Sequence, residues 1–153
     1  MEIVNKYIGI PHYFGESSFK KCDCIGLCRL FYRNHGWNHP IEDGKPVDKD
    51  HFSEPSVWRR LYKYCLLNMT QVFYDELSFG DFVIFKIDGD LHTGIYLGYG
   101  DLLSMQVPTV YGASTSTIYH RAWWSVKYRW LSYRRRQKTT AARPKSDSVP
   151  TSA

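Results

Sequence analysis

The sequence predicts an α+β fold in which helices come first and pack on an antiparallel β-meander that follows them. Two segments in the first half carry apolar residues at the i, i+3, i+4 and i+7 spacing of a helix with one buried face. From residue 82 onward the apolar residues alternate with other residues, and turn signals separate the runs. Of the 153 residues, 43% are hydrophobic and 16% are aromatic, which is enough for one domain with a buried core.

The helices are expected in three places. A short helix at the N-terminus extends through Tyr7 and ends before a turn at residues 9–11. The second begins at Cys24, because the side chains at 27, 28 and 31 continue its apolar face and Asp23 is a suitable N-cap. His35-Gly36 supplies a basic last turn and a C′ glycine at its end.

The third helix is expected after a long surface loop at residues 37–52. It begins at Ser53-Glu54-Pro55 and ends near Asn68, two limits that fit helix start and stop signals. Its buried stripe is formed by four residues: Val57, Leu61, Tyr64 and Cys65.

The strands follow from alternation and turn residues. Residues 82–85 and 92–97 form the first two strands, and Asp88-Gly89 between them is a hairpin turn signal. Another turn leads into a strand at 102–107, and an aromatic and basic strand at about 126–133 closes the sheet. The sequence has no internal repeat.

The net charge of +5 belongs to the end of the chain. Residues 134–153 hold six basic residues and one acidic residue, whereas the rest balances at 14 of each sign. We therefore expect one compact domain at 1–136 and a disordered basic tail at 137–153, where Thr, Ser, Ala and Pro are frequent. A neutral body argues against nucleic acid as the partner, and no apolar run is long enough to span a membrane.

Four cysteines stand at positions 22, 24, 28 and 65. Three of them fall within seven residues and the first residues lack a secretory signal pattern, so we expect reduced thiols. A metal site is the alternative. The Cys-x-Cys spacing is not that of a zinc knuckle, and no second Cys/His pair completes one, so no metal ligand is assigned.

Cys24 is the candidate nucleophile. A thiol at a helix N-terminus lies near unpaired N–H groups and the positive end of the helix dipole, which favour the thiolate. The candidate base is His92, which shares one strand face with Gly94 and Tyr96, opposite Ile95. If a helix packs on the His92 face, thiol and imidazole meet and form an activated nucleophile.

Three segments together resemble the NlpC-type cell-wall cysteine peptidases, a branch of the papain-like fold. Residues 23–27, Asp-Cys-Ile-Gly-Leu, are similar to the family motif Asp-Cys-Ser-Gly-Leu. Residues 7–16 are similar to its Tyr-x-Gly-x-Pro-Tyr segment, which an aromatic residue and glycines follow. Residues 80–85 are similar to its Gly-Asp-hydrophobic strand, and residues 92–98 to its His-Val-Gly-Ile-Tyr-Leu-Gly. The resemblance runs in order from about Tyr7 to Arg136.

The resemblance implies that Cys24 attacks a peptide bond with His92 as base, while the backbone amide at the helix start holds the oxyanion. It implies peptidoglycan stem peptides as substrate and no metal or organic cofactor. Tyr13 and Asp23 are the substrate-binding residues by position. Tyr13 is assigned because the family tyrosine after the proline is His12 here and Tyr13 is adjacent.

Two further departures concern the residues beside the dyad. The serine after the nucleophile is Ile25, which has no side-chain hydrogen bond to offer. The third catalytic residue of the family stands about twelve positions after the base, and that position is Ser104. Gln106 remains an alternative because it shares the strand face with Ser104 and carries an amide.

Trp123-Trp124 and the basic strand after them resemble the closing strand of phage-borne members of the family. The first residues lack the pattern of a signal peptide, which fits delivery in a phage tail or release from the host cytoplasm by lysis. Other phage tail proteins are then expected partners. The competing function is a non-catalytic structural or binding module of a phage tail that keeps the fold, and a third is amide hydrolysis on another substrate.

Overall fold

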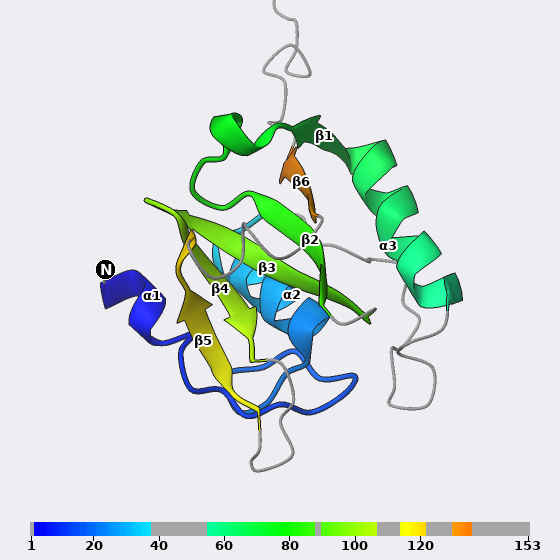
Figure 1. Cartoon of the computed structure of the whole chain (residues 1–153). Helices are drawn as coiled ribbons and strands as arrows, with labels where there is room; N and C mark the ends of the chain where they lie inside the picture. The colour runs from blue at the N-terminus through cyan, green and yellow to red at the C-terminus, as the bar shows by residue number, and fades with distance from the viewer. Residues whose placement is uncertain (1, 38–54, 88–89, 107–113, 122–129, 136–153) are drawn as a thin grey trace, which may run out of the picture.

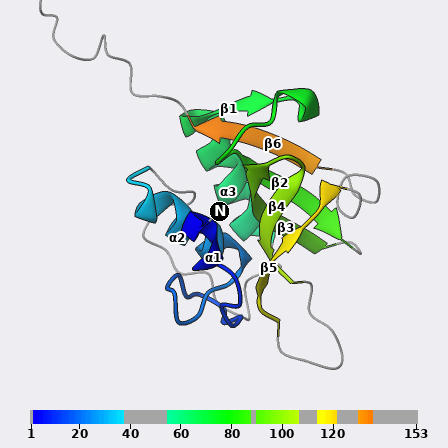
Figure 2. The ribbon, with the colours of Figure 1, turned by 90° about the vertical axis from the view of Figure 1, so that its left-hand side faces the viewer.

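A six-stranded antiparallel sheet with helices on one face forms the protein (Figures 1 and 2). The computed structural model describes residues 2–37, 55–87, 90–106, 114–121 and 130–135. This arrangement is the expected α+β architecture of helices packed on an antiparallel sheet.

The helices agree with the sequence pattern, except that the first ends at Asn5 and not at Tyr7. They are α1 (Glu2–Asn5), α2 (Cys24–Asn34) and α3 (Pro55–Asn68). Asp23 is the N-cap of α2, because its Oδ1 accepts a hydrogen bond from the Gly26 N–H at 2.6 Å. Gly36 follows the helix with a φ of 71°, a backbone conformation that glycine adopts without strain.

The sheet has the strand order β1-β6-β2-β3-β4-β5. Its strands are β1 (Met69–Val72), β2 (Phe82–Ile87), β3 (Asp90–Gly98), β4 (Asp101–Met105), β5 (Ser116–Tyr119) and β6 (Trp130–Arg135). A 3₁₀ turn, η1 (Tyr74–Glu76), follows β1. Strands β2 to β4 are the expected meander, β5 continues it beyond β4, and β6 lies between β2 and β1.

The main core lies between the helices and one face of the sheet (Figure 2). Buried side chains of α2 and α3, such as Phe31 and Leu61, pack there with Phe82, Ile95 and Leu103 of the strands. The opposite face holds a smaller buried cluster of Val83, Phe85 and Leu102, against which tyrosine side chains pack. Each strand therefore contributes alternate residues to two different environments.

Two strands were not expected from the sequence. Both β1 and β5 are only four residues long, too short for an alternating pattern to distinguish them from a loop. The closing strand is described over Trp130–Arg135, and residues 126–129, where it was expected to begin, lie outside the described residues. The predicted loop at 37–52 beyond Trp37, the turn at 88–89, Trp123-Trp124 and the tail at 137–153 lie outside the described residues.

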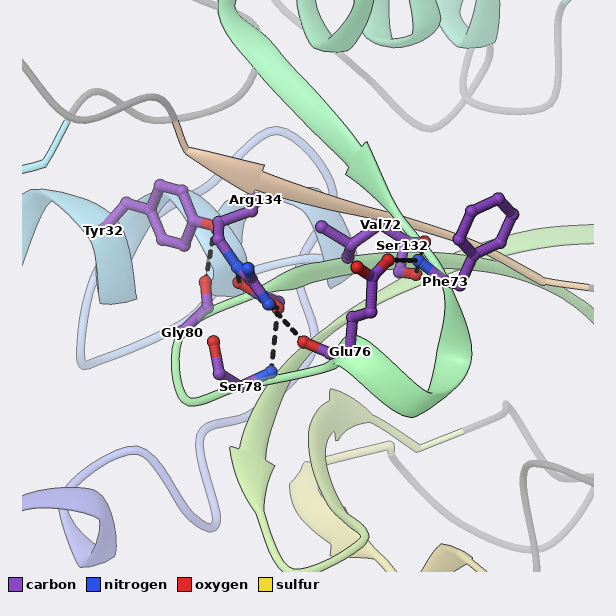
Figure 3. A network of polar contacts seen from close by, with 9 residues as sticks. Tyr32, Val72, Phe73, Glu76, Ser78, Gly80, Ser132 and Arg134 are labelled. Carbon is purple, nitrogen blue, oxygen red and sulfur yellow. Dashed lines mark hydrogen bonds and ion pairs between the residues drawn. The ribbon is translucent and has the colours of Figure 1, made fainter.

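Polar contacts hold β6 between β1 and β2 (Figure 3). The Arg134 guanidinium donates to both oxygens of Asp81, with Nε–Oδ1 at 3.2 Å and Nη2–Oδ2 at 3.1 Å, and also to the Glu76 carbonyl. Ser132 Oγ donates to the Val72 carbonyl at 2.7 Å. These bonds connect β6 to β2 on one side and to β1 and η1 on the other.

Among the described residues, no helix is both long enough and apolar enough to cross a membrane.

Candidate active site

Cys24 is the first residue of α2 and is buried. Its side chain is 2% exposed. The loop formed by residues 11–22 crosses the helix start, where the Tyr13 N–H donates to the Cys22 carbonyl and the Asp23 N–H donates to the Glu16 carbonyl. The helix start and this loop are therefore one packed unit around the thiol.

The carboxylate of Asp23 connects the start of α2 to the loop formed by residues 11–22. Its Oδ1 accepts from the Gly26 N–H at 2.6 Å and its Oδ2 from the Gly15 N–H at 2.8 Å. Gly26 is required by the close approach of the loop, since a Cβ on it would lie 2.0 Å from the Glu16 carbonyl oxygen. Asp23 thus has a structural role, and its contact with substrate stays a prediction.

Thr93 of β3 connects the strand to the start of the helix. Its Oγ1 donates to the Cys24 carbonyl at 2.8 Å and accepts from Cys28 Sγ at 3.6 Å. The side chain of Thr93 is fully buried. The structure therefore brings the residue that follows His92 into direct contact with the first turn of α2.

His92 lies on the other face of β3. It pairs with Phe85 across β2 and β3, and their rings are 5.9 Å apart, beside the smaller cluster. The expectation that a helix packs on the His92 face is wrong, because α2 packs on the face of Thr93 and Ile95. His92 is 9% exposed and adjoins the residue that contacts Cys24; its role as the base stays a prediction.

The Cys24 thiol does not have the lowered pKa expected at a helix N-terminus. Burial, with the nearby Asp23 carboxylate, raises its pKa well above the usual value. Hydrogen bonds to the side chain and backbone of Thr93 and to the Ile25 backbone lower it by less. The expectation was wrong because burial destabilises the thiolate more than the N-terminus of the helix stabilises it.

Ser104 lies on β4, paired with Gly94 on the same face as His92. It is fully buried, and its Oγ donates to the Thr93 carbonyl at 2.9 Å. Gln106 is exposed, and its Oε1 accepts from the N–H and the hydroxyl of Thr115, both at 3.2 Å. The orienting role of Ser104 stays a prediction, while Gln106 holds the chain at Thr115.

Tyr13 is the site residue that faces solvent. Its side chain is 55% exposed, and the Lys21 ammonium lies 4.1 Å from the centre of its ring. His12, which occupies the position of the family tyrosine, packs edge-on against Phe14 at 4.5 Å, and burial lowers its pKa. Of the two neighbours, Tyr13 is the more exposed, and its contact with substrate stays a prediction.

Sequence reasoning missed Thr93 and Cys28 as parts of this site. The alternation of β3 already placed Thr93 on the Ile95 face, so recognising that the helix packs on this face would have found it. All four cysteines are free thiols and are buried. No three His, Cys, Asp or Glu side chains gather as a metal site within the described part of the chain.

Comparison with known proteins points to one family. The model of the NlpC/P60 family matches residues 9–135. Among solved structures, NlpC1 from Trichomonas vaginalis superposes with a TM-score of 0.58 at 16% identity, covering 90% of this chain and 43% of that one. NlpC2 from the same organism gives 0.56 at 17% identity, with coverages of 88% and 44%. The NlpC/p60 domain of peptidoglycan hydrolase SagA gives 0.49 at 18% identity, with coverages of 84% and 90%.

At these identities the two Trichomonas vaginalis structures show a shared fold. The chain spans less than half the length of the two Trichomonas vaginalis proteins. No curated protein matches it.

Proposed function

This chain belongs to the NlpC/P60 family, and on that premise we propose that it is a cysteine peptidase that hydrolyses amide bonds in peptidoglycan stem peptides. The observation that supports the proposal is the position of Cys24. It is the first residue of α2, and a hydrogen bond to Thr93 ties it to β3 at the residue next to His92. Thiol hydrolysis of an amide needs a nucleophile and a base within reach of each other, so the proposal requires the His92 imidazole to reach the Cys24 thiol from the other face of β3.

In the proposed reaction, His92 takes the proton of the Cys24 thiol as Sγ attacks the amide carbonyl carbon. The Cys24 thiol has a raised pKa, so transfer to a base during attack provides a more accessible route than a standing thiolate. The imidazolium then gives the proton to the leaving amine, and a thioester forms on Cys24. Water activated by His92 hydrolyses the thioester and restores the thiol.

The developing oxyanion needs hydrogen-bond donors at the helix start. The Ile25 backbone lowers the pKa of the Cys24 thiol, so the Ile25 N–H is the proposed donor to the oxyanion. The Gly26 N–H is occupied by Asp23 and is not available for this task. Ser104 is proposed to orient His92, since a hydroxyl that donates to the Thr93 carbonyl still has an acceptor lone pair.

Substrate contact is proposed for Tyr13, with Asp23 acting by shaping the loop that carries it. Tyr13 is exposed on the loop above Cys24, and its ring offers an apolar face and a phenolic hydroxyl. No cofactor is part of the proposal. A phage tail, or the host cytoplasm before release, is the proposed location, with other tail proteins as partners.

A second candidate is a structural or binding module of a phage tail that keeps the fold without turnover. The observation in its favour is the burial of Cys24, which raises the pKa of the thiol that the peptidase needs to activate. Ile25 is also buried and offers no polar side chain beside the thiol. The two candidates share peptidoglycan as a ligand and differ in whether a bond is broken.

The experiment incubates purified peptidoglycan with the protein and with its Cys24→Ala variant. Sedimentation measures binding to the insoluble polymer, and mass spectrometry identifies released peptides. The peptidase predicts stem-peptide fragments from the wild-type protein alone, with binding retained by both. Binding without release from either protein would favour the tail module, and equal release from both would exclude the thiol mechanism.

A further inference from the structure

The hydroxyl of Thr93 lies between two cysteines at the first turn of α2. It donates to the Cys24 carbonyl at 2.8 Å, and Cys28 Sγ donates to it at 3.6 Å. Thr93 is fully buried, as is Cys28, and Cys24 is 2% exposed. A strand residue therefore contacts two helix residues that are one turn apart, with polar groups inside an otherwise apolar core.

We propose that Thr93 is a positioning residue that fixes the start of α2, and with it the Cys24 thiol, against the strand that carries His92. The proposal rests on the proposed function for its consequence in turnover. The positioning of Cys24 by Thr93 is a property of the free protein and can be measured without substrate. The geometry it requires is the contact between Thr93 and the helix start.

Packing alone does not explain this hydroxyl. Valine has nearly the same shape as threonine and fills such a position without a polar atom. A buried hydroxyl without partners is unfavourable, so it is expected where its hydrogen bonds are used. Here the proton and a lone pair of Thr93 Oγ1 both have partners, and both partners belong to α2.

The hydrogen bond from Thr93 is made to the backbone of Cys24 itself, so it acts on the position of the residue that carries the thiol. A helix start can shift and rotate when loop contacts alone hold it, and here Asp23 fixes the helix to the loop formed by residues 11–22. The loop, however, is not part of the strand that carries His92. The Thr93 hydroxyl supplies a direct connection between Cys24 and β3. Since Thr93 follows His92, the same connection sets the separation of the two proposed catalytic residues.

The ionisation of Cys24 gives independent support. Hydrogen bonds to the Thr93 side chain and backbone lower the pKa of the Cys24 thiol, which burial raises overall. The other titratable groups here are Asp23 and Cys28 on the helix side, Cys22 before the helix, and His92 beside Thr93. Substitution of Thr93 leaves all of them in place, so a change in thiol reactivity reports on Thr93.

The test measures alkylation of Cys24 by iodoacetamide as a function of pH. Trypsin releases residues 22–29 as one peptide after Lys21, and fragment ions distinguish Cys24 from Cys22 and Cys28. Thr93→Val removes the hydroxyl and keeps the shape, whereas Thr93→Ser keeps the hydroxyl. Thr70→Val, at an exposed position of strand β1, is the matched control.

In Thr93→Val we expect iodoacetamide to alkylate Cys24 about three- to tenfold more slowly, at a fixed pH below the midpoint of the Cys24 titration. Loss of one hydrogen bond should raise the pKa of this thiol by about half to one unit. Thr93→Ser and Thr70→Val should keep the wild-type rate and midpoint. If cleavage of stem peptides is observed, kcat/KM should fall in Thr93→Val and recover in Thr93→Ser. The alkylation result stands even when no cleavage is found, so failure of the proposed function is seen separately.

An unchanged pH profile in folded Thr93→Val would overturn the proposal. Circular dichroism verifies folding, and Thr93→Ala replaces Thr93→Val if the latter does not fold. If neither folds while Thr93→Ser does, the hydroxyl supports the whole fold rather than the thiol position, and the proposal is also overturned. Faster alkylation of Cys24 in either variant would mean that Thr93 shields the thiol instead of positioning it, which equally contradicts the proposal.

Discussion

Asp23 joins the start of α2 to the loop before it. One oxygen caps α2 through Gly26, and the other holds the loop through Gly15. Burial raises the pKa of this carboxyl, and the hydrogen bonds from Gly26 and Gly15 oppose the shift. The residue before the nucleophile therefore fixes the backbone on both sides of it.

We predict that Asp23→Ala lowers the free energy of unfolding by about 1–3 kcal/mol, because a helix cap is lost and the Gly15 N–H loses its acceptor. Urea denaturation followed by circular dichroism measures the change. Asp75→Ala, at an exposed position in η1, is the control and should change stability little. Equal stability of Asp23→Ala and Asp75→Ala would contradict the structural role of Asp23.

Residue-scale features were predictable where they depend on neighbours in the chain. The N-cap at Asp23 and the helix start at Cys24 follow from local spacing, and both are confirmed. The raised pKa of Cys24 was not predictable, since it depends on burial, which is a result of tertiary packing. The contact with Thr93 was missed for the same reason, as 69 positions separate the two residues.

At the scale of elements, the position of β6 depends on the pair formed by Arg134 and Asp81 (Figure 3). Asp81 is buried, while the Arg134 side chain is about 40% exposed. Ser78 N–H also donates to Asp81 Oδ2 at 2.9 Å. Nearby, the Tyr32 hydroxyl of α2 donates to the Gly80 carbonyl at 2.6 Å. The turn before β2 is thus fixed to both β6 and α2.

We predict that Arg134→Ala destabilises the protein by about 1–3 kcal/mol, less than for a fully buried pair because solvent reaches the guanidinium. The loss arises because a buried carboxylate keeps only part of its hydrogen bonds. Thermal or urea unfolding measures it, with Arg59→Ala on the exposed side of α3 as control. If both substitutions lower the free energy of unfolding by the same small amount, the pair of Arg134 and Asp81 does not hold β6.

Elements with a long local pattern were predicted, and short or non-local ones were not. Helix α2 and strands β2 to β4 have clear periodicity and are confirmed. Strands β1 and β5 have four residues each, and their pairing with β6 and β4 is a tertiary property. The packing of α2 on the Thr93 face was likewise undetermined, because both faces of β3 bear apolar residues.

For the whole molecule, the four buried thiols make stability depend on alkaline pH. Burial raises the pKa of Cys22 and of Cys65 to about 12, and raises the pKa of Cys24 and Cys28 also. The unfolded chain therefore loses these protons first as the pH rises. The free energy of unfolding should be unaffected by the thiols at neutral pH and decrease from about pH 9 upward.

Cys65 allows this to be tested away from the site. We predict that Cys65→Ala reduces the loss of stability by about 1.4 kcal/mol per pH unit over the range between its unfolded and folded pKa values. Urea unfolding of both proteins is measured at pH 7, 9 and 10. The difference in stability at pH 7 gives the effect of the cavity that the substitution leaves, and it is subtracted from the differences at higher pH. Parallel stability curves of variant and wild type would contradict buried ionisable thiols as the cause.

The central claim, that the Cys24 thiol is the nucleophile of a stem-peptide hydrolase, is tested most directly by kcat/KM on a defined stem peptide. The account predicts that Cys24→Ala loses about a thousandfold or more of the wild-type value, as removal of a covalent nucleophile does. The control Cys65→Ala removes another buried thiol and should stay within a few-fold of wild type. Cleavage by Cys24→Ala at the rate of Cys65→Ala would contradict it.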